Sequence, residues 1–253
     1  EEKSKEYDKC PNGILGLETM LPVVYTYFVK TGKATHQQFV DWFVTNPAKI
    51  FNLPVNKIEI GVDQDAVITP GNDLFNKGRV VCYGTSITQG GCASRVGMVP
   101  SAMIQREYNL ECVNLSTSGN ARMDFYIAEA LADIEDAICY VIDPVPNCTK
   151  DRCDTATYDF IKILRTLRPE VPIIMVEGIM YPYTRHNSFH AEYLPQKNEC
   201  FRRGYEQHLA ENPKGLYYMT HDGQVGPEME GTVDGVHLTD YGFRAYADLL
   251  EVK

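Results

Sequence analysis

Short apolar strands alternate with amphipathic helices over residues 79–250, and this alternation limits the folds open to the chain. The strands are apolar almost throughout, which is typical of strands buried on both faces. Such strands, alternating with helices, predict a parallel sheet covered by helices on both sides. The predicted strands are 79–83, 111–115, 137–143, 171–177 and 216–219, and the predicted helices are 98–107, 121–134, 155–167, 197–210 and 239–250. Five strands in about 178 residues fit a flavodoxin-like, three-layer α/β/α domain with a five-stranded parallel sheet.

The stretch 67–78, which reads VITPGNDLFNKG, has the composition of a linker. We therefore expect two parts, residues 1–75 and residues 76–253. In the first part the pattern predicts helices at 18–30 and 36–44 and a small β-hairpin at 57–68. An isolated pair of helices is marginally stable, so these helices need an apolar partner. Either the α/β domain or a second copy of the chain, in a homo-oligomer, would supply it.

Charge and hydropathy exclude several classes of partner. The formal net charge is −10 and both parts are mildly acidic, whereas nucleic acids and anionic membranes require clustered Lys and Arg. The longest apolar runs, such as 171–176, are far too short to span a bilayer. Residues 1–9 are charged and no apolar segment follows them, so the sequence given shows no signal peptide. A cytoplasmic protein and a mature secreted form would both look like this.

The eight cysteines are scattered, and no two of them stand in a Cys-x-x-Cys pair. This argues against a zinc ribbon and against a thioredoxin-like site. Cys82, Cys112 and Cys139 lie inside apolar strands, where cysteine behaves as a small hydrophobic residue. We expect reduced, structural thiols.

Several polar residues follow the predicted strands. In an open α/β sheet, ligands bind beyond the carboxyl ends of the strands. The segments at this edge are GTSITQGG (84–91), STSGN (116–120), PVPN (144–147) and, before the last helix, VDGVHLT (233–239). They bring Ser86, Gly119, Asn147, Asp234 and His237 to one edge of the sheet.

A serine beside a histidine and an aspartate suits nucleophilic catalysis. A serine hydroxyl is a poor nucleophile at neutral pH and needs an adjacent base. His237 is the candidate base, and Asp234 would hold its other ring nitrogen. The two stand three residues apart before a helix, so one local structure can orient both.

The four segments resemble, in order, the four signature blocks of the SGNH/GDSL hydrolases, a family of serine esterases. The likeness is greatest to the subgroup with GTSITQGGCASR, which stands here at 84–95, and it runs over essentially all of 76–253. The resemblance implies the SGNH hydrolase fold and an acyl-serine mechanism with Ser86 as nucleophile and Asp234 and His237 completing a catalytic triad. It also implies an oxyanion hole made by the backbone N–H groups of Ser86 and Gly119 and the side-chain amide of Asn147.

By the same resemblance, the substrate is a small-molecule or carbohydrate ester with a short acyl group, such as an acetyl group on a carbohydrate. No metal and no cofactor are expected.

Two positions depart from the family pattern. Thr85 precedes the serine where the wider superfamily has Asp, although Thr is expected in this subgroup. The third block has no Gly two residues before Asn147 and reads PVPNC over 144–148. Taken singly, each block also has a structural interpretation, because Ser, Asp and Asn cap helices and turns and Gly turns the chain.

The segment 181–193 holds two histidines four residues apart, His186 and His190. It is rich in Pro, Asn and Ser, which predicts a loop, and no acidic pair accompanies the histidines at ligand spacing, so we do not expect a metal site there. Tyr181, Tyr183 and Arg185 are candidates for substrate contacts, since loops over the strand ends carry specificity. A solvated surface explains them equally well.

Residues 11–68 resemble the C-terminal end of class I dihydroorotases. The likeness rests on GILGLET (13–19), TNPAKIF (45–51) and IEIGVDQDAVI (58–68). That family's metal-binding His-x-His and bridging lysine lie in earlier barrel strands, which have no counterpart here, so this segment cannot perform metal-dependent hydrolysis. Two alternatives to an esterase stay open: a dihydroorotase-like cyclic amidohydrolase fragment, and a non-catalytic binding module with the SGNH fold. A natural fusion and a chimaeric or artefactual chain are equally compatible with the sequence.

Overall fold

The computed structural model describes residues 25–35, 38–39, 41–42, 77–226 and 228–251. The chain divides into two units, Glu1–Asn72 and Asp73–Lys253. The sheet and its covering helices belong to the second unit.

The described residues of the first unit are partly helical. η3 (Tyr25–Lys30) is a π-helix within the helix predicted at 18–30. Thr35 and Gln38 cap one another, since each backbone N–H donates to the other's side chain, at 2.8 and 3.1 Å. Residues 38–39 and 41–42, within the helix predicted at 36–44, are also helical. The other residues of the two predicted helices, the predicted hairpin at 57–68 and most of the linker at 67–78 lie outside the described residues.

The second unit contains the predicted parallel sheet. Its strands are β1 (Arg79–Gly84), β2 (Glu111–Asn114), β3 (Ala137–Asp143), β4 (Ile173–Val176) and β5 (Leu216–Met219), all parallel, in the order β2-β1-β3-β4-β5. This order confirms the flavodoxin-like expectation. The chain runs from β1 outward to β2 and then returns past β1 to β3. The carboxyl ends of β1 and β3 therefore flank the switch point at which doubly wound sheets bind their ligands.

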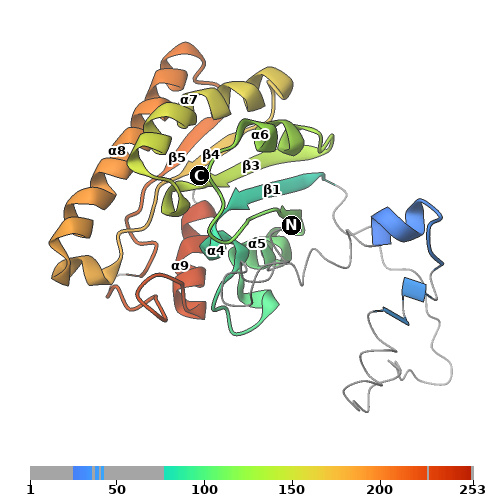
Figure 1. Cartoon of the computed structure of the whole chain (residues 1–253), viewed down its shortest axis with the longest axis horizontal. Coiled ribbons are helices and arrows are strands. Elements are labelled where there is room, and N and C mark those ends of the chain that lie inside the picture. Colours follow the sequence, from blue (N-terminus) through green and yellow to red (C-terminus); the bar gives the residue numbers. More distant parts are fainter. Residues whose placement is uncertain (1–24, 36–37, 40, 43–76, 227, 252–253) are drawn as a thin grey trace, which may run out of the picture. The chain divides into compact units, whose positions relative to one another are not determined.

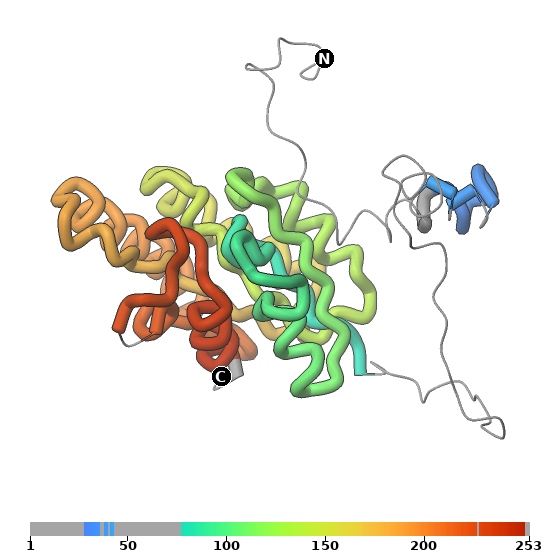
Figure 2. Tube along the Cα trace, turned by 90° about the horizontal axis from the view of Figure 1, so that it is seen from below, coloured from blue at the N-terminus to red at the C-terminus, as the bar shows by residue number. Residues whose placement is uncertain are grey.

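Helices cover both faces of the sheet (Figure 1). One face carries α6 (Phe125–Ala132), α7 (Lys150–Leu167) and α8 (Ser188–Glu211), and the other carries α5 (Pro100–Tyr108) and α9 (Asp240–Glu251). Figure 2 shows α5 in green and α9 in red from below, and the two helices are in contact. No helix in the described part of the chain is long and apolar enough to cross a membrane.

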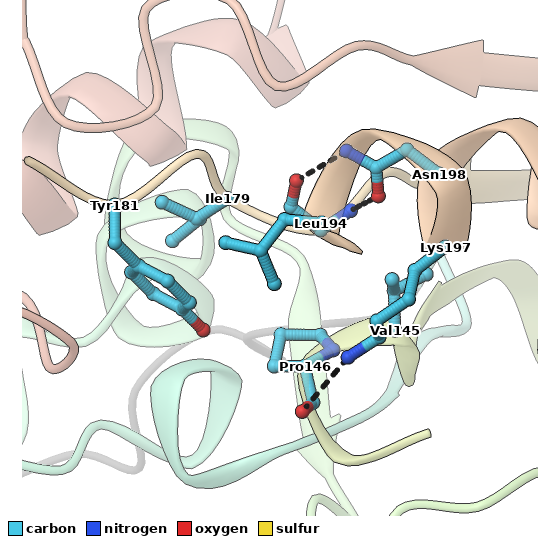
Figure 3. Close-up of a pocket in the computed structure, with 8 residues that line it drawn as sticks. Val145, Pro146, Ile179, Tyr181, Leu194, Lys197 and Asn198 are labelled. Atoms are coloured by element: carbon cyan, nitrogen blue, oxygen red, sulfur yellow. Dashed lines mark hydrogen bonds between the residues drawn. The ribbon is translucent and has the colours of Figure 1, made fainter. Parts of the chain in front are cut away.

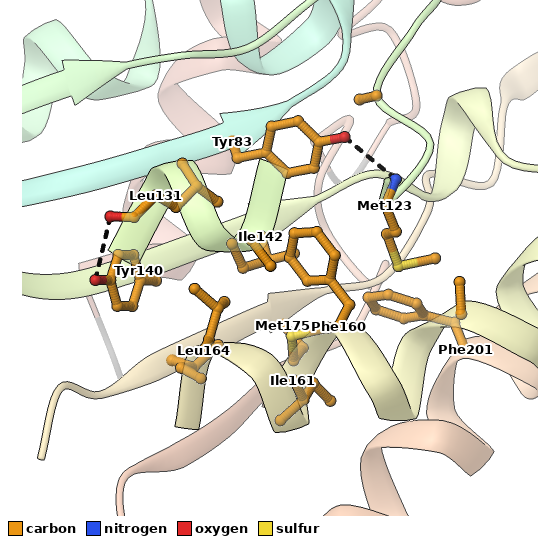
Figure 4. Packing of buried hydrophobic residues seen from close by; sticks show 14 of the residues in the cluster. Tyr83, Met123, Leu131, Tyr140, Ile142, Phe160, Ile161, Leu164, Met175 and Phe201 are labelled. Carbon is orange, nitrogen blue, oxygen red and sulfur yellow. Dashed lines mark hydrogen bonds between the residues drawn. The ribbon is translucent and has the colours of Figure 1, made fainter. Parts of the chain in front are cut away.

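The two faces of the sheet bury separate apolar clusters. In β1, Val81 and Tyr83 belong to the cluster under α6, α7 and α8, whereas Val80 and Cys82 belong to the cluster under α5 and α9. Figure 4 shows Tyr83 above Phe160, with their rings stacked at 5.8 Å between centroids. Because successive strand residues point to opposite faces, the central strands have to be apolar at nearly every position.

Two helices begin earlier than predicted, and capping explains both. α7 begins at Lys150 because the Thr149 hydroxyl accepts the Arg152 N–H at 3.1 Å. α8 begins at Ser188 because the Asn187 side chain accepts the His190 N–H at 3.0 Å. The predicted loop at 181–193 is thus wrong for residues 188–193, which are helical, and η7 (Pro182–His186) is a 3-10 helix.

The described cysteines are Cys82, Cys92, Cys112, Cys139, Cys148, Cys153 and Cys200, and all seven are free thiols. Of the three that the sequence places in strands, Cys82 is buried and Cys112 and Cys139 are half-buried.

Candidate active site

Ser86 is the first residue of α4 (Ser86–Gln89), directly after β1. Thr85 is the N-cap of this short helix, since its hydroxyl accepts the Ile87 N–H at 3.3 Å. The capping role therefore belongs to Thr85 and not to Ser86. The Ser86 hydroxyl instead lies 3.0 Å from Nε2 of His237, a residue 151 positions later in the chain.

His237 connects Ser86 to Asp234. Its Nδ1 lies 2.7 Å from Oδ2 of Asp234, whose Oδ1 accepts the N–H groups of Val236 and His237 at 2.9 and 2.7 Å. The hydrogen bond from the His237 side chain, followed by that from its backbone, holds the pKa of Asp234 below its usual range. An ionised Asp234 favours the proton on Nδ1, so Nε2 faces the Ser86 hydroxyl as an acceptor.

The loop that carries Asp234 and His237 is closed on itself. Thr232 and Leu238 form an antiparallel bridge, and the Val233 N–H donates to the His237 carbonyl at 2.8 Å. Gly235 adopts a φ of +87°, which strains residues with a Cβ atom. These contacts fix the positions of both side chains just before α9 begins.

The expected oxyanion donors lie on the neighbouring loops. Gly119 has a φ of +69°, and Asn147 ends η6 (Val145–Asn147) after β3. Oδ1 of Asn147 accepts the Ala121 N–H at 3.2 Å, which joins its amide to the Gly119 loop and leaves Nδ2 as the donor. Within 77–226, neither this Nδ2 nor the backbone N–H groups of Ser86 and Gly119 donate to a protein acceptor.

Asp143 at the end of β3 is a buried carboxyl that the sequence patterns did not single out. Its Oδ2 accepts the hydroxyls of Thr88 and Tyr246 at 2.5 and 2.9 Å, so it links β3 to α4 and α9. Complete burial raises its pKa to about 7, although both hydrogen bonds act in the opposite direction. A polar residue at the end of a buried strand was the available signal, since such positions face the ligand edge.

Asn114 at the end of β2 was also not singled out. Its Nδ2 donates to the Thr88 carbonyl at 2.8 Å and to the Ser101 hydroxyl at 3.2 Å. Its Oδ1 accepts the Ser116 N–H at 3.1 Å. Asn114 thus holds the short helix of Ser86 against α5 and the second strand-end loop.

One group of side chains in the described residues could hold a metal ion: Cys92, Asp234 and His237, whose ligand atoms all lie within 4.8 Å of one another. A sulfur, a carboxylate and an imidazole suit zinc. A metal bound there would compete for the ring nitrogens that contact Ser86 and Asp234.

The segment 181–193 contacts the loop of Asp234 through Tyr183. Tyr181 and Tyr183 stack at 5.5 Å between centroids, and Tyr183 lies against Gly235 of the Asp234 loop. The ring of His190 packs edge-on against Tyr183. The guanidinium of Arg185 contacts the sulfur of Met229. His186 lies at the end of η7.

Comparison with known proteins gives a family for the second unit. Residues 77–253 match the model of the GDSL-like Lipase/Acylhydrolase family. The chain belongs to this family. A GDSL-like lipase from Bacteroides ovatus has 34% sequence identity and a TM-score of 0.67, and the match covers 75% of this chain and 58% of that one. The expected fold and family are thus confirmed, and this GDSL-like chain spans little more than half of that relative.

A more distant relative has the same fold. The family 3 carbohydrate esterase of Clostridium thermocellum matches with a TM-score of 0.51 and 14% identity, over 69% of this chain and 94% of that one. At this identity the likeness concerns the fold alone.

The dihydroorotase resemblance is also confirmed over a short stretch. Dihydroorotase from Shouchella clausii is 44% identical over 68 residues, which are 27% of this chain and 16% of that enzyme. The chain therefore spans about one sixth of the curated relatives it matches.

Proposed function

We propose that this GDSL-family chain hydrolyses a carboxylic ester through an acyl-serine intermediate, with Ser86, His237 and Asp234 as its triad. One observation carries the proposal: the hydrogen-bonded series Ser86–His237–Asp234, with distances of 3.0 and 2.7 Å, at the ligand edge of a doubly wound sheet. The family's acylhydrolase character supports it.

The mechanism follows from these contacts. Ser86 Oγ attacks the ester carbonyl carbon while His237 Nε2 takes the hydroxyl proton, and Asp234 stabilises the imidazolium. The oxyanion accepts hydrogen bonds from the Ser86 and Gly119 N–H groups and from the Asn147 amide. His237 then protonates the leaving alcohol. A water molecule that gives its proton to His237 attacks the acyl-serine, and release of the acid restores the Ser86 hydroxyl.

For the substrate, we propose an ester with a short acyl group, with acetyl on a carbohydrate as one candidate. A carbohydrate esterase of the same fold supports this class.

Labelling with a serine-directed fluorophosphonate tests the proposal. We expect the reagent to label Ser86, to leave Ser86→Ala unlabelled and to label His237→Ala far more slowly, because the hydroxyl has then lost its base. Ser188→Ala, which removes an exposed serine at the start of α8, is the matched control and should label like the parent.

The same experiment separates the alternatives. A non-catalytic binding module would give no label on Ser86, and equal labelling of His237→Ala would contradict the triad. A metal-dependent amidohydrolase would lose ester or amide hydrolysis on treatment with a chelator, whereas the acyl-serine mechanism predicts no loss.

A further inference from the structure

Cys148 and Cys153 are two buried thiols at the start of α7. Cys148 directly precedes the N-cap residue Thr149, and Cys153 is the fourth residue of the helix. Side chains at these two positions commonly pack against one another, and here a hydrogen bond joins the two thiols. Both belong to the apolar cluster under α6, α7 and α8. The start of this helix therefore holds two sulfur atoms side by side in the interior.

Lys197 of α8 places a positive charge near these thiols. Its side chain is only 5% exposed, and Figure 3 shows its ammonium bonded to the Pro146 carbonyl, at the long distance of 3.4 Å. A buried ammonium is costly unless it is paired with an anion. No carboxylate in the described part of the chain pairs with Lys197, and its titratable neighbours are Cys153 and Cys148. A thiolate is therefore the counter-ion that its surroundings can supply.

Cys148 is the thiol that these neighbours activate. The hydrogen bond from Cys153, together with positive charges such as that of Lys197, holds the pKa of Cys148 below its usual value, although burial opposes this. The same hydrogen bond, and then burial, raise the pKa of Cys153. A thiolate is the form of cysteine that reacts with oxidants, and a neighbouring thiol can then complete a disulfide. The pair thus has a nucleophile and a resolving partner.

Cys148 also joins the two proposed oxyanion loops. It directly follows Asn147, and both residues bond to Ala121, which stands two residues after Gly119. Oδ1 of Asn147 accepts the Ala121 N–H at 3.2 Å, and the protonated thiol of Cys148 donates to the Ala121 carbonyl at 3.6 Å. A bond between the sulfurs of Cys148 and Cys153 removes this thiol donor. The change therefore reaches the turn of Asn147 and the Gly119 loop.

We propose that Cys148 and Cys153 are a redox-active pair, which hydrogen peroxide converts to a disulfide that lowers the activity of the neighbouring site. The oxidant has to be small, since both thiols are nearly buried, and hydrogen peroxide meets this condition. Only the effect on turnover rests on the proposed function. The disulfide does not.

The reaction takes two steps. The sulfur of Cys148 attacks one peroxide oxygen, the O–O bond breaks, and the released hydroxide takes the thiol proton as water, which leaves a sulfenic acid on Cys148. The sulfur of Cys153 then attacks the Cys148 sulfur, the S–O bond breaks, and the hydroxide leaves with the Cys153 proton as a second water. The two thiols lose two electrons to the peroxide, and dithiothreitol returns them.

Mass spectrometry tests the disulfide without any turnover. Trypsin cleaves twice between the two cysteines, so the disulfide would join the peptides 123–150 and 153–162. After the full chain is treated with hydrogen peroxide and its free thiols are alkylated, we expect these two peptides to be linked. Fragmentation should place the bond at Cys148 and not at Cys139, which lies in the same peptide. Dithiothreitol should separate the peptides.

Dimedone, which traps sulfenic acids, distinguishes the roles of the two thiols. In the parent protein Cys153 should consume the sulfenic acid, so that Cys148 carries little label. In Cys153→Ala, dimedone should label Cys148 strongly, and in Cys148→Ala it should leave Cys153 unlabelled. Cys200→Ala, which removes the buried thiol of α8 near this pair, is the matched control and should form the disulfide like the parent.

Hydrolysis of a short-chain ester tests the effect on the site. Oxidation should lower kcat of the parent by about 10²-fold, as for the loss of one oxyanion donor, and dithiothreitol should restore it. Cys148→Ala should keep its own rate after the same treatment, because it cannot form the disulfide. An equal loss in Cys148→Ala would assign the effect to another residue and overturn the proposal.

Three further results decide the proposal. Absence of the linked peptides from the oxidised parent, or absence of dimedone from Cys148 in Cys153→Ala, would overturn the redox pair. A disulfide that leaves kcat unchanged would overturn its effect on the site. Reversible formation of the disulfide in a protein that hydrolyses no ester would refute the proposed esterase and retain the redox pair.

Discussion

His237 contacts Ser86 through one ring nitrogen and Asp234 through the other, so its tautomer is fixed by its neighbours rather than by solvent. Asp234 is itself held by two backbone N–H groups of its own loop. The local contacts that hold the proposed base therefore lie within the seven residues 232–238. At the residue scale, Ser86 and Asn147 differ from this pair, because each contacts a residue of another loop.

Asn147→Ala tests the proposed oxyanion role. Loss of one such donor typically lowers turnover by about 10²–10³-fold. We expect a decrease of this size in kcat toward a short-chain ester, with an unchanged far-ultraviolet circular dichroism spectrum. Asn212→Ala, at the exposed end of α8, is the control and should keep full activity. Parent-like turnover in Asn147→Ala would remove this residue from the mechanism.

Cys92 leads to a prediction about metal ions. Because its thiol lies close to Asp234 and His237, Zn²⁺ at low concentration should inhibit hydrolysis by binding all three side chains. Removal of zinc with a chelator should restore the rate. Cys92→Ser should be active and much less sensitive to zinc; an unchanged inhibition constant in this variant would contradict the assignment.

At the scale of secondary-structure elements, Asp143 joins β3, α4 and α9 through two hydroxyl donors. A carboxyl group buried among these elements is stable in its protonated form. Its ionisation therefore places a charge in the interior, beside the short helix that carries Ser86. This contact makes the stability of the domain depend on pH.

Ionisation of Asp143 should destabilise the folded domain as pH rises. The pKa of Asp143 is about 7 in the folded protein and 3.8 in the reference state, so between these values the folded protein binds the additional proton. The free energy of unfolding should therefore fall as pH rises from about 4 to 7, by at most roughly 1.4 kcal/mol per pH unit. Urea denaturation at pH 5 and pH 8 should show this loss in the parent and little of it in Asp143→Asn. Asp159→Asn, an exposed substitution on α7, should behave like the parent.

Sequence patterns predict the strands better than the helices here. The spans of β3 and β5 are predicted without error, because each is an apolar run bounded by residues that favour turns or water, Asp136 and Pro144 for β3 and Gly215 and Thr220 for β5. The starts of α7 and α8 are missed, because Thr149 and Asn187 are polar residues in segments with loop-like composition, and Pro195 inside α8 looks like a helix breaker.

Sequence patterns likewise identify only part of the candidate site. Ser86, His237 and Asp234 stand in motifs with a chemical interpretation, so the sequence points to them directly. Asp143 and Asn114 stand in no such motif, because what they do depends on partners from distant elements, such as Tyr246 for Asp143 and Ser101 for Asn114.

At the scale of the whole molecule, the chain combines a GDSL-family unit with a stretch similar to part of dihydroorotase. Every element of the sheet and every residue of the proposed site lies within 79–251. The two apolar clusters that cover the sheet are likewise made by residues of this unit.

We therefore predict that residues 73–253 fold and act alone. This fragment should unfold in one cooperative transition, and its kcat/KM toward short esters should stay within about threefold of the full chain. A fragment that is folded but inactive would show that residues 1–72 contribute to the site. Activity measured beside the full chain at several concentrations also tests whether a second copy is needed.

The distance along the chain between Ser86 and His237 has a consequence for synthesis. A ribosome that has made the five strands, the proposed nucleophile and both proposed oxyanion loops has still not made the proposed base, which stands 151 residues after Ser86. Nascent chains, and fragments that stop before residue 234, would therefore lack both the proposed base and α9, and Ser86 would not be activated. Hydrolysis would begin only when α9 closes behind the last loop, so the order of translation itself delays the chemistry until the domain is complete.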